Sequence, residues 1–243
     1  MDDHPNTDEP SAGLTRRGSL LRLGGLAAGA LGATAWKLDA PDDAAGAGAG
    51  PAAVATGPVT CVLSPEQTLG PYFTEGDKVR RNVREGRPGV ALDLRTTVVD
   101  VSTCTPIRGA AVDIWHCDAT GTYSGFAQEG TEGKTFMRGI QRTDRLGLAR
   151  FHTIYPGWYE GRTVHIHVQV YLGGDVLHTG QLYFPDANTD LVFRRAPYSR
   201  RPGRTTRNAT DSIFRNGGSR SMLKLARSGS GYIGRITMGV QTS

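Results

Sequence analysis

Several features that would assign this chain to other structural classes are missing from it. The apolar stretch at residues 23–35 is shorter than the about 20 residues that an ordinary bilayer-spanning helix needs. Long runs with helical periodicity are absent, and no internal repeat stands out. The three cysteines form no C-x-x-C pair, the spacing typical of structural zinc sites. We therefore expect no stable membrane anchor, no helical bundle and no cysteine-based metal site.

The composition is that of an ordinary globular protein. The chain has 243 residues, 38% hydrophobic and 21% charged, which suffices for one packed domain and an appendage. Its 33 glycines and 13 prolines favour a β fold rich in loops. The net charge of +5 favours anionic partners. A nucleic-acid binder would show steep salt dependence, but its only support is the arginine-rich stretch 194–227, so we expect no nucleic-acid partner.

The first 60 residues are typical of export and spacing. Arg16 and Arg17 stand in "TRRGSLLRL", just ahead of the apolar run, and Ala33-Thr34-Ala35 offers a small-residue cleavage pattern. Residues 1–35 thus resemble a twin-arginine signal peptide, and residues 36–60 form a Gly/Ala/Pro-rich spacer with too little apolar bulk to fold. The sequence predicts a secreted or extracytoplasmic protein whose folded domain covers residues 61–243.

Short β-type runs separated by turn residues fill that domain. They lie at 90–101, 109–117, 149–156, 163–172, 178–184 and 231–240. Short helices are expected only around 211–215 and near Met222. Thr143, Asp144 and Gly147 suit a tight hairpin turn, and Phe151 suits a core position. The predicted fold is all-β, a β-sandwich of short strands with long connecting loops.

The cysteines favour one disulfide pairing. Cys104 and Cys117 flank the strand expected over 110–117, and at about 3.3 Å per residue its length keeps them beyond disulfide reach. Cys61 with Cys104 is then the expected bridge, and Cys117 is left as a small buried thiol.

The strand at 163–172 carries two histidines on one face. From Val164 the residues alternate, so His165, His167 and Gln169 point to one side and the valines and Ile166 to the other. Side chains at i and i+2 stand roughly 7 Å apart at their roots and can converge on one metal ion. A half-buried strand with histidines on its polar face is the alternative. Tyr123 and Tyr159 lie near the ends of neighbouring runs, where each alone is more often an ordinary half-buried tyrosine.

Three longer runs carry a family resemblance. "GAAVDIWHCDATGTYSG", "RTDRLGLARFHTIYPGWYEGRTVHIHV" and "GQLYF" occur in this order, and "SPEQTLGPYF" precedes them. Together they resemble the intradiol ring-cleavage dioxygenases that act on catechols, especially their exported bacterial branch. The resemblance implies four iron ligands, Tyr123, Tyr159, His165 and His167, with Tyr159 and His167 as the axial pair. Two phenolates and two imidazoles suit Fe(III), and no carboxylate stands by the histidines as the Fe(II) oxygenases require.

The same resemblance implies a reaction and its supporting residues. A catechol would bind Fe(III) through both oxygens, Tyr159 would leave the metal with a proton, and dioxygen would open the ring between the hydroxyl-bearing carbons to a cis,cis-muconate. Arg162 matches an arginine that faces the bound ring, where a fixed cation stabilises negative charge. Gln181 matches a glutamine that orients substrate or oxygen. A surface ion pair for Arg162 and a strand-edge amide for Gln181 are the plainer alternatives.

Other positions are less specific. Leu69, Pro71 and Tyr72 match a segment that lines the family's aromatic site, although they also suit core packing. His116, Trp115 and His178 are interpreted as structural, and residues 194–227 as a solvated basic loop rather than a lid for anionic aromatic material.

Two further points stay open at this stage. A non-catalytic β-sandwich that holds iron or a catecholate is the competing function, and removal of Arg162 would separate it from an enzyme. The spacer before Cys61 leaves no room for the helical dimerisation segment of the intracellular relatives, so the oligomeric state is not predicted.

Overall fold

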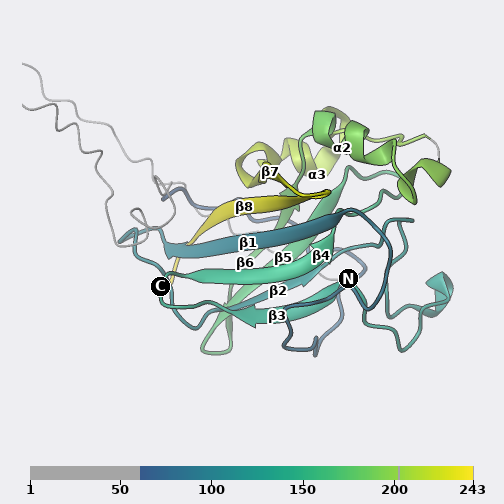
Figure 1. Ribbon diagram of the computed structural model, residues 1–243. Coiled ribbons are helices and arrows are strands. Elements are labelled where there is room, and N and C mark those ends of the chain that lie inside the picture. Colours follow the sequence, from purple (N-terminus) through teal and green to yellow (C-terminus); the bar gives the residue numbers. More distant parts are fainter. Residues whose placement is uncertain (1–60, 202, 243) are drawn as a thin grey trace, which may run out of the picture. The chain divides into compact units, whose positions relative to one another are not determined.

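The computed structural model describes residues 61–201 and 203–242, so the predicted signal peptide and spacer at 1–60 lie outside the described residues. Within that part, eight strands form two four-stranded sheets in the orders β4-β1-β8-β7 and β3-β2-β5-β6. Their bounds are β1 Ala91–Asp100, β2 Ala111–Trp115, β3 Arg138–Arg142, β4 Leu148–Ile154, β5 His165–Leu172, β6 Asp175–Tyr183, β7 Lys224–Ser228 and β8 Gly231–Val240. Figure 1 shows the two sheets, and the β-sandwich expected from the alternating runs is thus present.

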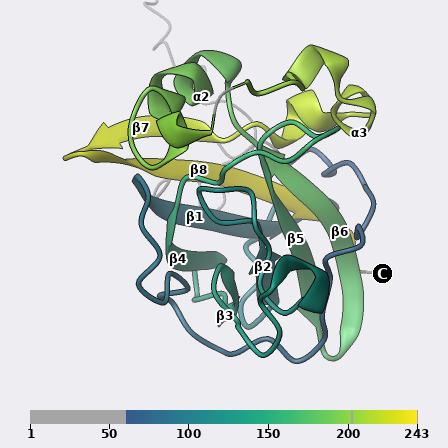
Figure 2. The same ribbon diagram turned by 90° about the vertical axis from the view of Figure 1, so that its right-hand side faces the viewer.

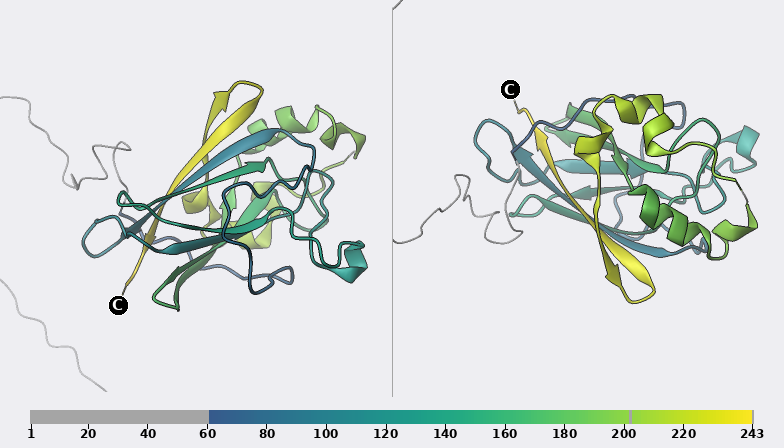
Figure 3. Two further views of the ribbon diagram at one scale, coloured as in Figure 1. Left: turned by 60° about the horizontal axis from the view of Figure 1, so that its bottom comes forward. Right: turned by 90° about the horizontal axis from the view of Figure 1, so that it is seen from above.

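Pairing is antiparallel except between β1 and β8, which run parallel. Figure 3 shows the β7–β8 hairpin at the edge of its sheet. Two strands were not foreseen, β3 and β7, because "RGIQR" and "KLARS" carry too little alternation to stand out in the sequence. The turn at Thr143, Asp144 and Gly147 is present, but the expected hairpin is wrong. β3 pairs with β2 and β4 pairs with β1, so the turn passes the chain from one sheet to the other.

The helical segments are short, and all except the 3-10 helix at Ala127–Glu129 gather at one end of the sandwich in Figures 1 and 2. They are α2 Asp186–Phe193 and α3 Ser212–Arg215, together with 3-10 helices at Ala127–Glu129, Tyr198–Arg200, Asn208–Thr210 and Gly218–Ser221. α3 confirms the helix expected around 211–215, and the segment before Met222 is a 3-10 turn. α2 was not foreseen. No helix among residues 61–201 and 203–242 is long and apolar enough to cross a membrane.

The core lies between the sheets and is made by the inward residues of both. Leu92, Leu94 and Phe151 come from one sheet, and Ile166 and Val168 from the other; all are fully or almost fully buried. This apolar burial is the main favourable free energy of the fold. The opposite face of β5, which carries the histidines, is buried too. The alternative of a half-buried strand with histidines on an exposed polar face is therefore wrong.

The N-terminal segment covers that second face. Cys61 and Cys104 are disulfide-bonded with their Cα atoms 5.4 Å apart, and Cys117 is a free, buried thiol. Glu66 accepts hydrogen bonds from His178 and from the Thr179 backbone on β6, which gives His178 a structural role. The segment is thereby fixed across β5 and β6 before it reaches Leu69 and Tyr72.

The arginine-rich stretch is solvated as expected over most of its arginines, which are exposed, but it is not a plain loop. Its backbone forms short helices, and Arg204 is nearly buried between Asp186 and Asp190 of α2. Arg201 lies 4.2 Å over the ring of Trp158 and donates to the Thr120 carbonyl. Arg201 thus holds the helical end of the domain to the loops that carry Thr120 and Trp158, and Arg204 holds the stretch to α2, because a planar guanidinium can pair with carboxylates, carbonyls and ring faces.

Two carboxyl groups lie beside each other, that of Asp113 on β2 and that of Asp77 in the segment before β1. Asp113 is 3% exposed, and it borders a cavity of about 480 Å³ with Gln169 and Tyr171. Burial and the neighbouring Asp77 raise the pKa of Asp113 to about 8, and burial raises the pKa of Asp77 as well. The two carboxyl groups therefore share a proton near neutral pH, since both cannot ionise side by side.

We expect the Asp113→Asn substitution to change how stability depends on pH. In the unfolded chain Asp113 ionises near pH 4, whereas in the folded protein it keeps its proton to about 8. The wild type therefore loses stability as pH rises from 4 to 8, since folding there requires a proton that the unfolded chain has released. The carboxamide has no proton to lose, so the unfolding free energy of the variant is expected to rise relative to that of the wild type as the pH increases from 4 to 8. Urea unfolding at several pH values measures the difference.

Asp175→Asn is the matched control, because Asp175 is exposed and lies outside the pair. A constant difference in unfolding free energy between Asp113→Asn and the wild type from pH 4 to 8 would contradict the shared proton.

Candidate metal centre

The four residues expected as metal ligands come from three separate pieces of chain and lie in one cluster. His165 and His167 stand on β5, Tyr159 in the β4–β5 connection, and Tyr123 in the long loop after β2. The Nε2 atoms of the two histidines are 3.0 Å apart, and the Tyr159 hydroxyl is 3.2 Å from Nε2 of His165. The Tyr123 ring centroid lies 5.6 Å from that of Tyr159 and 6.5 Å from that of His167. Folding thus brings all four side chains together.

Both imidazoles present their Nε2 atoms to this cluster. Nδ1 of His165 is 2.6 Å from the Thr163 carbonyl and must donate to it, which leaves Nε2 as an acceptor. Burial, with the nearby Arg162, lowers the pKa of His165 well below its usual value. Burial and His165 do the same to the pKa of His167. Two neutral imidazoles whose Nε2 atoms face each other are what a cation between them requires.

The phenol oxygens of Tyr123 and Tyr159 also lie in surroundings that favour a bound cation. The Tyr123 hydroxyl is buried, and no protein group among the described residues makes a hydrogen bond of ordinary geometry to it. Burial, followed by the neighbouring Tyr159, raises its pKa well above 10. Burial also raises the pKa of Tyr159, to about 12. A buried polar atom without a partner is costly, and a cation bound to this oxygen would remove that cost.

Aromatic contacts hold these side chains in place. The Trp115 ring stacks on His167 with centroids 5.0 Å apart, so its predicted structural role includes supporting this imidazole. The Tyr72 ring stacks on Tyr123 at 4.0 Å. Gly70 passes so close to His167 that a Cβ atom there would lie 2.9 Å from its Cε1. His116, by contrast, is fully buried and bonds the Cys117 carbonyl and the Thr153 hydroxyl, away from the cluster, as a structural histidine should.

Of the expected pocket residues, Leu69 and Tyr72 are half-buried and contact the cluster formed by Trp115, Cys117 and Tyr123. Pro71 stands between them on the exposed side. The Tyr72 hydroxyl is 3.3 Å from the Glu129 carboxylate, which ties the segment to the loop that carries Tyr123. Leu69 and Tyr72 thus lie beside the clustered side chains, whereas no contact between described residues places Pro71 there.

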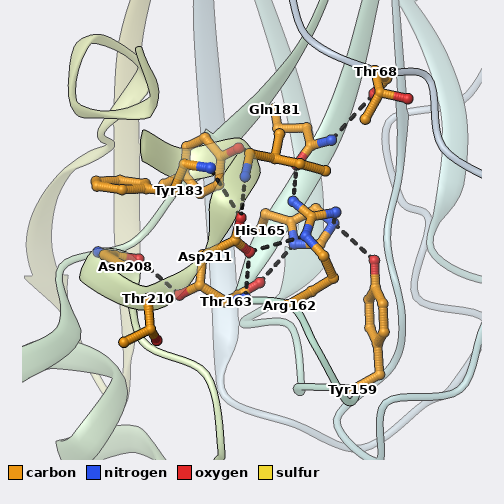
Figure 4. A network of polar contacts seen from close by, with 12 residues as sticks. Thr68, Tyr159, Arg162, Thr163, His165, Gln181, Tyr183, Asn208, Thr210 and Asp211 are labelled. Carbon is orange, nitrogen blue, oxygen red and sulfur yellow. Dashed lines mark hydrogen bonds and ion pairs between the residues drawn. The ribbon is translucent and has the colours of Figure 1, made fainter. Parts of the chain in front are cut away.

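Arg162 and Gln181 lie at the edge of the same cluster (Figure 4). The Arg162 guanidinium bonds the Gln181 amide oxygen, and its Nη1 lies 3.4 Å from Nε2 of His165. Arg162 is therefore not a surface ion pair. The Gln181 oxygen also accepts from the Tyr183 hydroxyl at 3.1 Å, and the amide nitrogen donates to the Thr68 carbonyl. These bonds make Gln181 a support for Arg162.

Sequence reasoning missed one member of this network, Asp211. It lies 2.9 Å from Nε of Arg162 and is 1% exposed. Two signals in the sequence pointed to it. It is the single acid in the basic stretch 194–227, and Asp directly before "SIF" is a typical helix N-cap.

The residue types in the cluster can hold a hard, highly charged cation. No group of three or more His, Cys, Asp and Glu side chains with metal-binding geometry occurs in the described part of the chain, so the available donors are the two phenols and two imidazoles. Two phenolates carry the negative charge that a trivalent ion needs, and imidazoles complete the coordination without adding charge. The unpartnered Tyr123 oxygen and the adjacent Nε2 atoms of the two histidines fit such an ion.

Comparisons with known proteins agree with this geometry. Residues 68–203 match the family Dioxygenase_C, described as Dioxygenase. The chlorocatechol 1,2-dioxygenase of Rhodococcus opacus is 29% identical in an alignment 140 residues long, and the match covers 47% of this chain and 54% of that protein. The chain thus spans about half the length of this curated relative.

Two solved structures are also similar. The intradiol ring-cleavage dioxygenase from Tetranychus urticae is 34% identical with a TM-score of 0.72, covering 74% of this chain and 95% of that one. The dioxygenase domain of a dioxygenase and carbohydrate-binding fusion protein from Streptomyces sp. SirexAA-E is 29% identical with a TM-score of 0.59, covering 75% and 100%. Since the family match extends over more than half of the chain, the protein belongs to the intradiol ring-cleavage dioxygenase family.

Proposed function

We propose that this chain is an Fe(III)-dependent enzyme that cleaves catechol-type aromatic diols with dioxygen, between the two hydroxyl-bearing carbons, to cis,cis-muconate-type products. The convergence of Tyr123, Tyr159, His165 and His167 in one buried cluster supports it most strongly. The relatives named for chlorocatechol and for intradiol ring cleavage support the same substrate class. Breakdown of plant- or lignin-derived aromatic compounds is the setting that we infer for it.

The four clustered residues would hold the ferric ion, which when bound supplies a Lewis acid for both diol oxygens. Tyr159 is the side chain suited to move a proton. Burial raises its phenolic pKa and so favours the neutral phenol, which means that a Tyr159 phenolate can take a proton from the incoming diol. Tyr159 is half-buried whereas Tyr123 is 1% exposed, so Tyr159 is also the phenol with room to move.

Arg162 supplies the fixed positive charge. Its guanidinium lies beside His165 and is held by Gln181, so the cation is already in place when negative charge develops on the substrate ring. We place the aromatic ring of the substrate against Leu69, Pro71 and Tyr72. Their apolar and aromatic surfaces exclude water from the reacting face and favour a flat ligand.

Product analysis is the direct test of this function. With catechol and iron-loaded protein, we expect one equivalent of dioxygen to be consumed and cis,cis-muconate to form. Tyr159→Phe should lower kcat by about 100-fold or more, because it removes the group that accepts the diol proton. Tyr232→Phe, on the other sheet, is the control and should keep normal turnover. A yellow semialdehyde product would contradict intradiol cleavage, and catechol binding without oxygen uptake would identify a non-catalytic binding module.

Gly70 offers a separate test of His167 as a ligand. Gly70 (φ +76°) and Gly86 (φ +75°) share a left-handed backbone, so alanine costs roughly 1 kcal/mol at either position. Only at position 70 would the new Cβ press on His167, whereas nothing lies within 4 Å at position 86. We expect Gly70→Ala to retain several-fold less iron per chain than Gly86→Ala, measured by elemental analysis after reconstitution. Equal iron content in the two variants would remove His167 from the ligand set.

Export by the twin-arginine route is part of the proposal, because this route carries proteins that have already folded around a cofactor. Arg16 and Arg17 before the apolar run at 23–35 support it. In a bacterial host with a twin-arginine translocase, the double change Arg16→Lys and Arg17→Lys should leave the full-length chain in the cytoplasm, as followed by cell fractionation. Arg22→Lys is the matched control and should be exported. Export of the double variant at the normal level would refute the route.

A further inference from the structure

Asp211 is a buried carboxylate that the proposed chemistry does not yet use. Its side chain is fully buried, and it lies on the segment between α2 and α3, far along the chain from the residues of the metal cluster. Figure 4 shows it at the centre of a polar network that includes Arg162, Thr163 and Gln181. A buried charge with nothing to balance it is strongly destabilising, and here Arg162 is the balancing charge.

Each oxygen of this carboxylate has defined partners. Oδ1 accepts from the backbone N–H groups of Ile213 and Phe214 at 2.8 and 2.9 Å, which caps the first turn of α3. Oδ2 accepts from the backbone N–H of Thr163 at 2.7 Å and from Nε of Arg162 at 2.9 Å. One side chain therefore joins the start of α3 to the loop that leads into β5.

The surroundings keep Asp211 rigid. Thr163 donates its hydroxyl to Asn208 at 2.7 Å, and Asn208 in turn donates to the Phe184 carbonyl at the end of β6. The loop before β5 is thus bound to the 208–211 segment at two successive points, Thr163 and Arg162. A rigid acceptor is needed to hold the long arginine side chain in one rotamer, since its conformational entropy otherwise favours many.

Arg162 is held at three edges by different groups. Nε bonds Asp211, Nη2 bonds the Gln181 oxygen, and Nη1 faces Nε2 of His165 at 3.4 Å. The bonds at Nε and Nη2 set the plane of the guanidinium, and this plane determines where Nη1 points. Loss of the Nε partner would leave the fork free to turn about its remaining bond to Gln181.

We propose that Asp211 is a positioning residue, which fixes the Arg162 guanidinium so that its charge faces the substrate ring. This proposal rests on the ring-cleavage function proposed above. Asp211, the single acid of the basic stretch, then supports the site through Arg162. The 208–214 segment is then part of the active centre rather than a surface loop.

Asp211→Asn is the test variant. Asparagine is as good an N-cap as aspartate, so its side-chain oxygen can still accept hydrogen bonds from the backbone N–H groups of Ile213 and Phe214. Its amide NH₂ then faces the N–H groups of Arg162 and Thr163, donor against donor. We expect kcat for catechol to fall by at least tenfold while KM changes less than threefold, because the diol oxygens bind at the cluster and not at Arg162. Asp190→Asn is the matched control. It removes an α2 carboxylate that pairs with Arg204 and Arg207, and we expect it to leave kcat unchanged.

A double-substitution cycle shows whether Asp211 acts through Arg162. If it does, Asp211→Asn adds no further loss of kcat to Arg162→Ala. Losses that multiply, or a kcat for Asp211→Asn equal to that of the wild type, would overturn the proposal while leaving ring cleavage intact. A wild type without ring cleavage would overturn the proposed function and this inference together.

A measurement on the metal-free protein is independent of activity. The side-chain Nε–H of Arg162, assigned by its absence in Arg162→Lys, should give a slowly exchanging NMR signal, since it donates to a buried carboxylate. The signal should be lost in Asp211→Asn and kept in Asp190→Asn. A signal that persists in Asp211→Asn would show that Arg162 is held without Asp211 and would overturn the proposal.

Discussion

Burial of both faces of β5 is the constraint on which this structure depends. One face supplies Ile166 and Val168 to the sandwich core, and the other carries His165 and His167 into an aromatic cluster. Burial keeps both imidazoles neutral and leaves their Nε2 atoms 3.0 Å apart. A sheet face that holds two neutral imidazoles beside two phenols satisfies its polar groups best with a cation present, so the fold and the proposed cofactor depend on the same strand.

The cover over this face explains much of the remaining architecture. The Cys61–Cys104 disulfide and the hydrogen bond between Glu66 and His178 of β6 hold the N-terminal segment in place. The segment then passes His167 at Gly70. The loop after β2 brings Tyr123 against Tyr72. The helical end contributes Asp211 to Arg162. Three long connections thus meet over one strand, which is how a rigid sandwich with irregular loops brings side chains from distant segments into one site.

The sequence predicted the features that repeat along a strand or occupy one motif. Alternation in 163–172 located β5 and its histidine face, and the motif residues led to both tyrosines and to Arg162. Three kinds of feature were out of reach. β3 and β7 lack alternation, and the turn at Asp144 was assigned to a hairpin because pairing partners cannot be read locally. Two arginines of the basic stretch, Arg204 and Arg207, pair with carboxylates whose place in space depends on α2. Asp211 shows the same limit, since its role arises from contacts 49 residues away.

The central claim is that two tyrosine oxygens and two histidine nitrogens of this cluster bind ferric iron and that a catechol joins them there. The visible absorption spectrum of the iron-loaded full-length protein, taken without oxygen before and after catechol is added, tests it most directly. The account predicts a wine-red protein with a tyrosinate-to-iron absorption band that shifts when catechol binds. A protein that takes up iron yet stays colourless, or a band that catechol leaves unchanged, would contradict it.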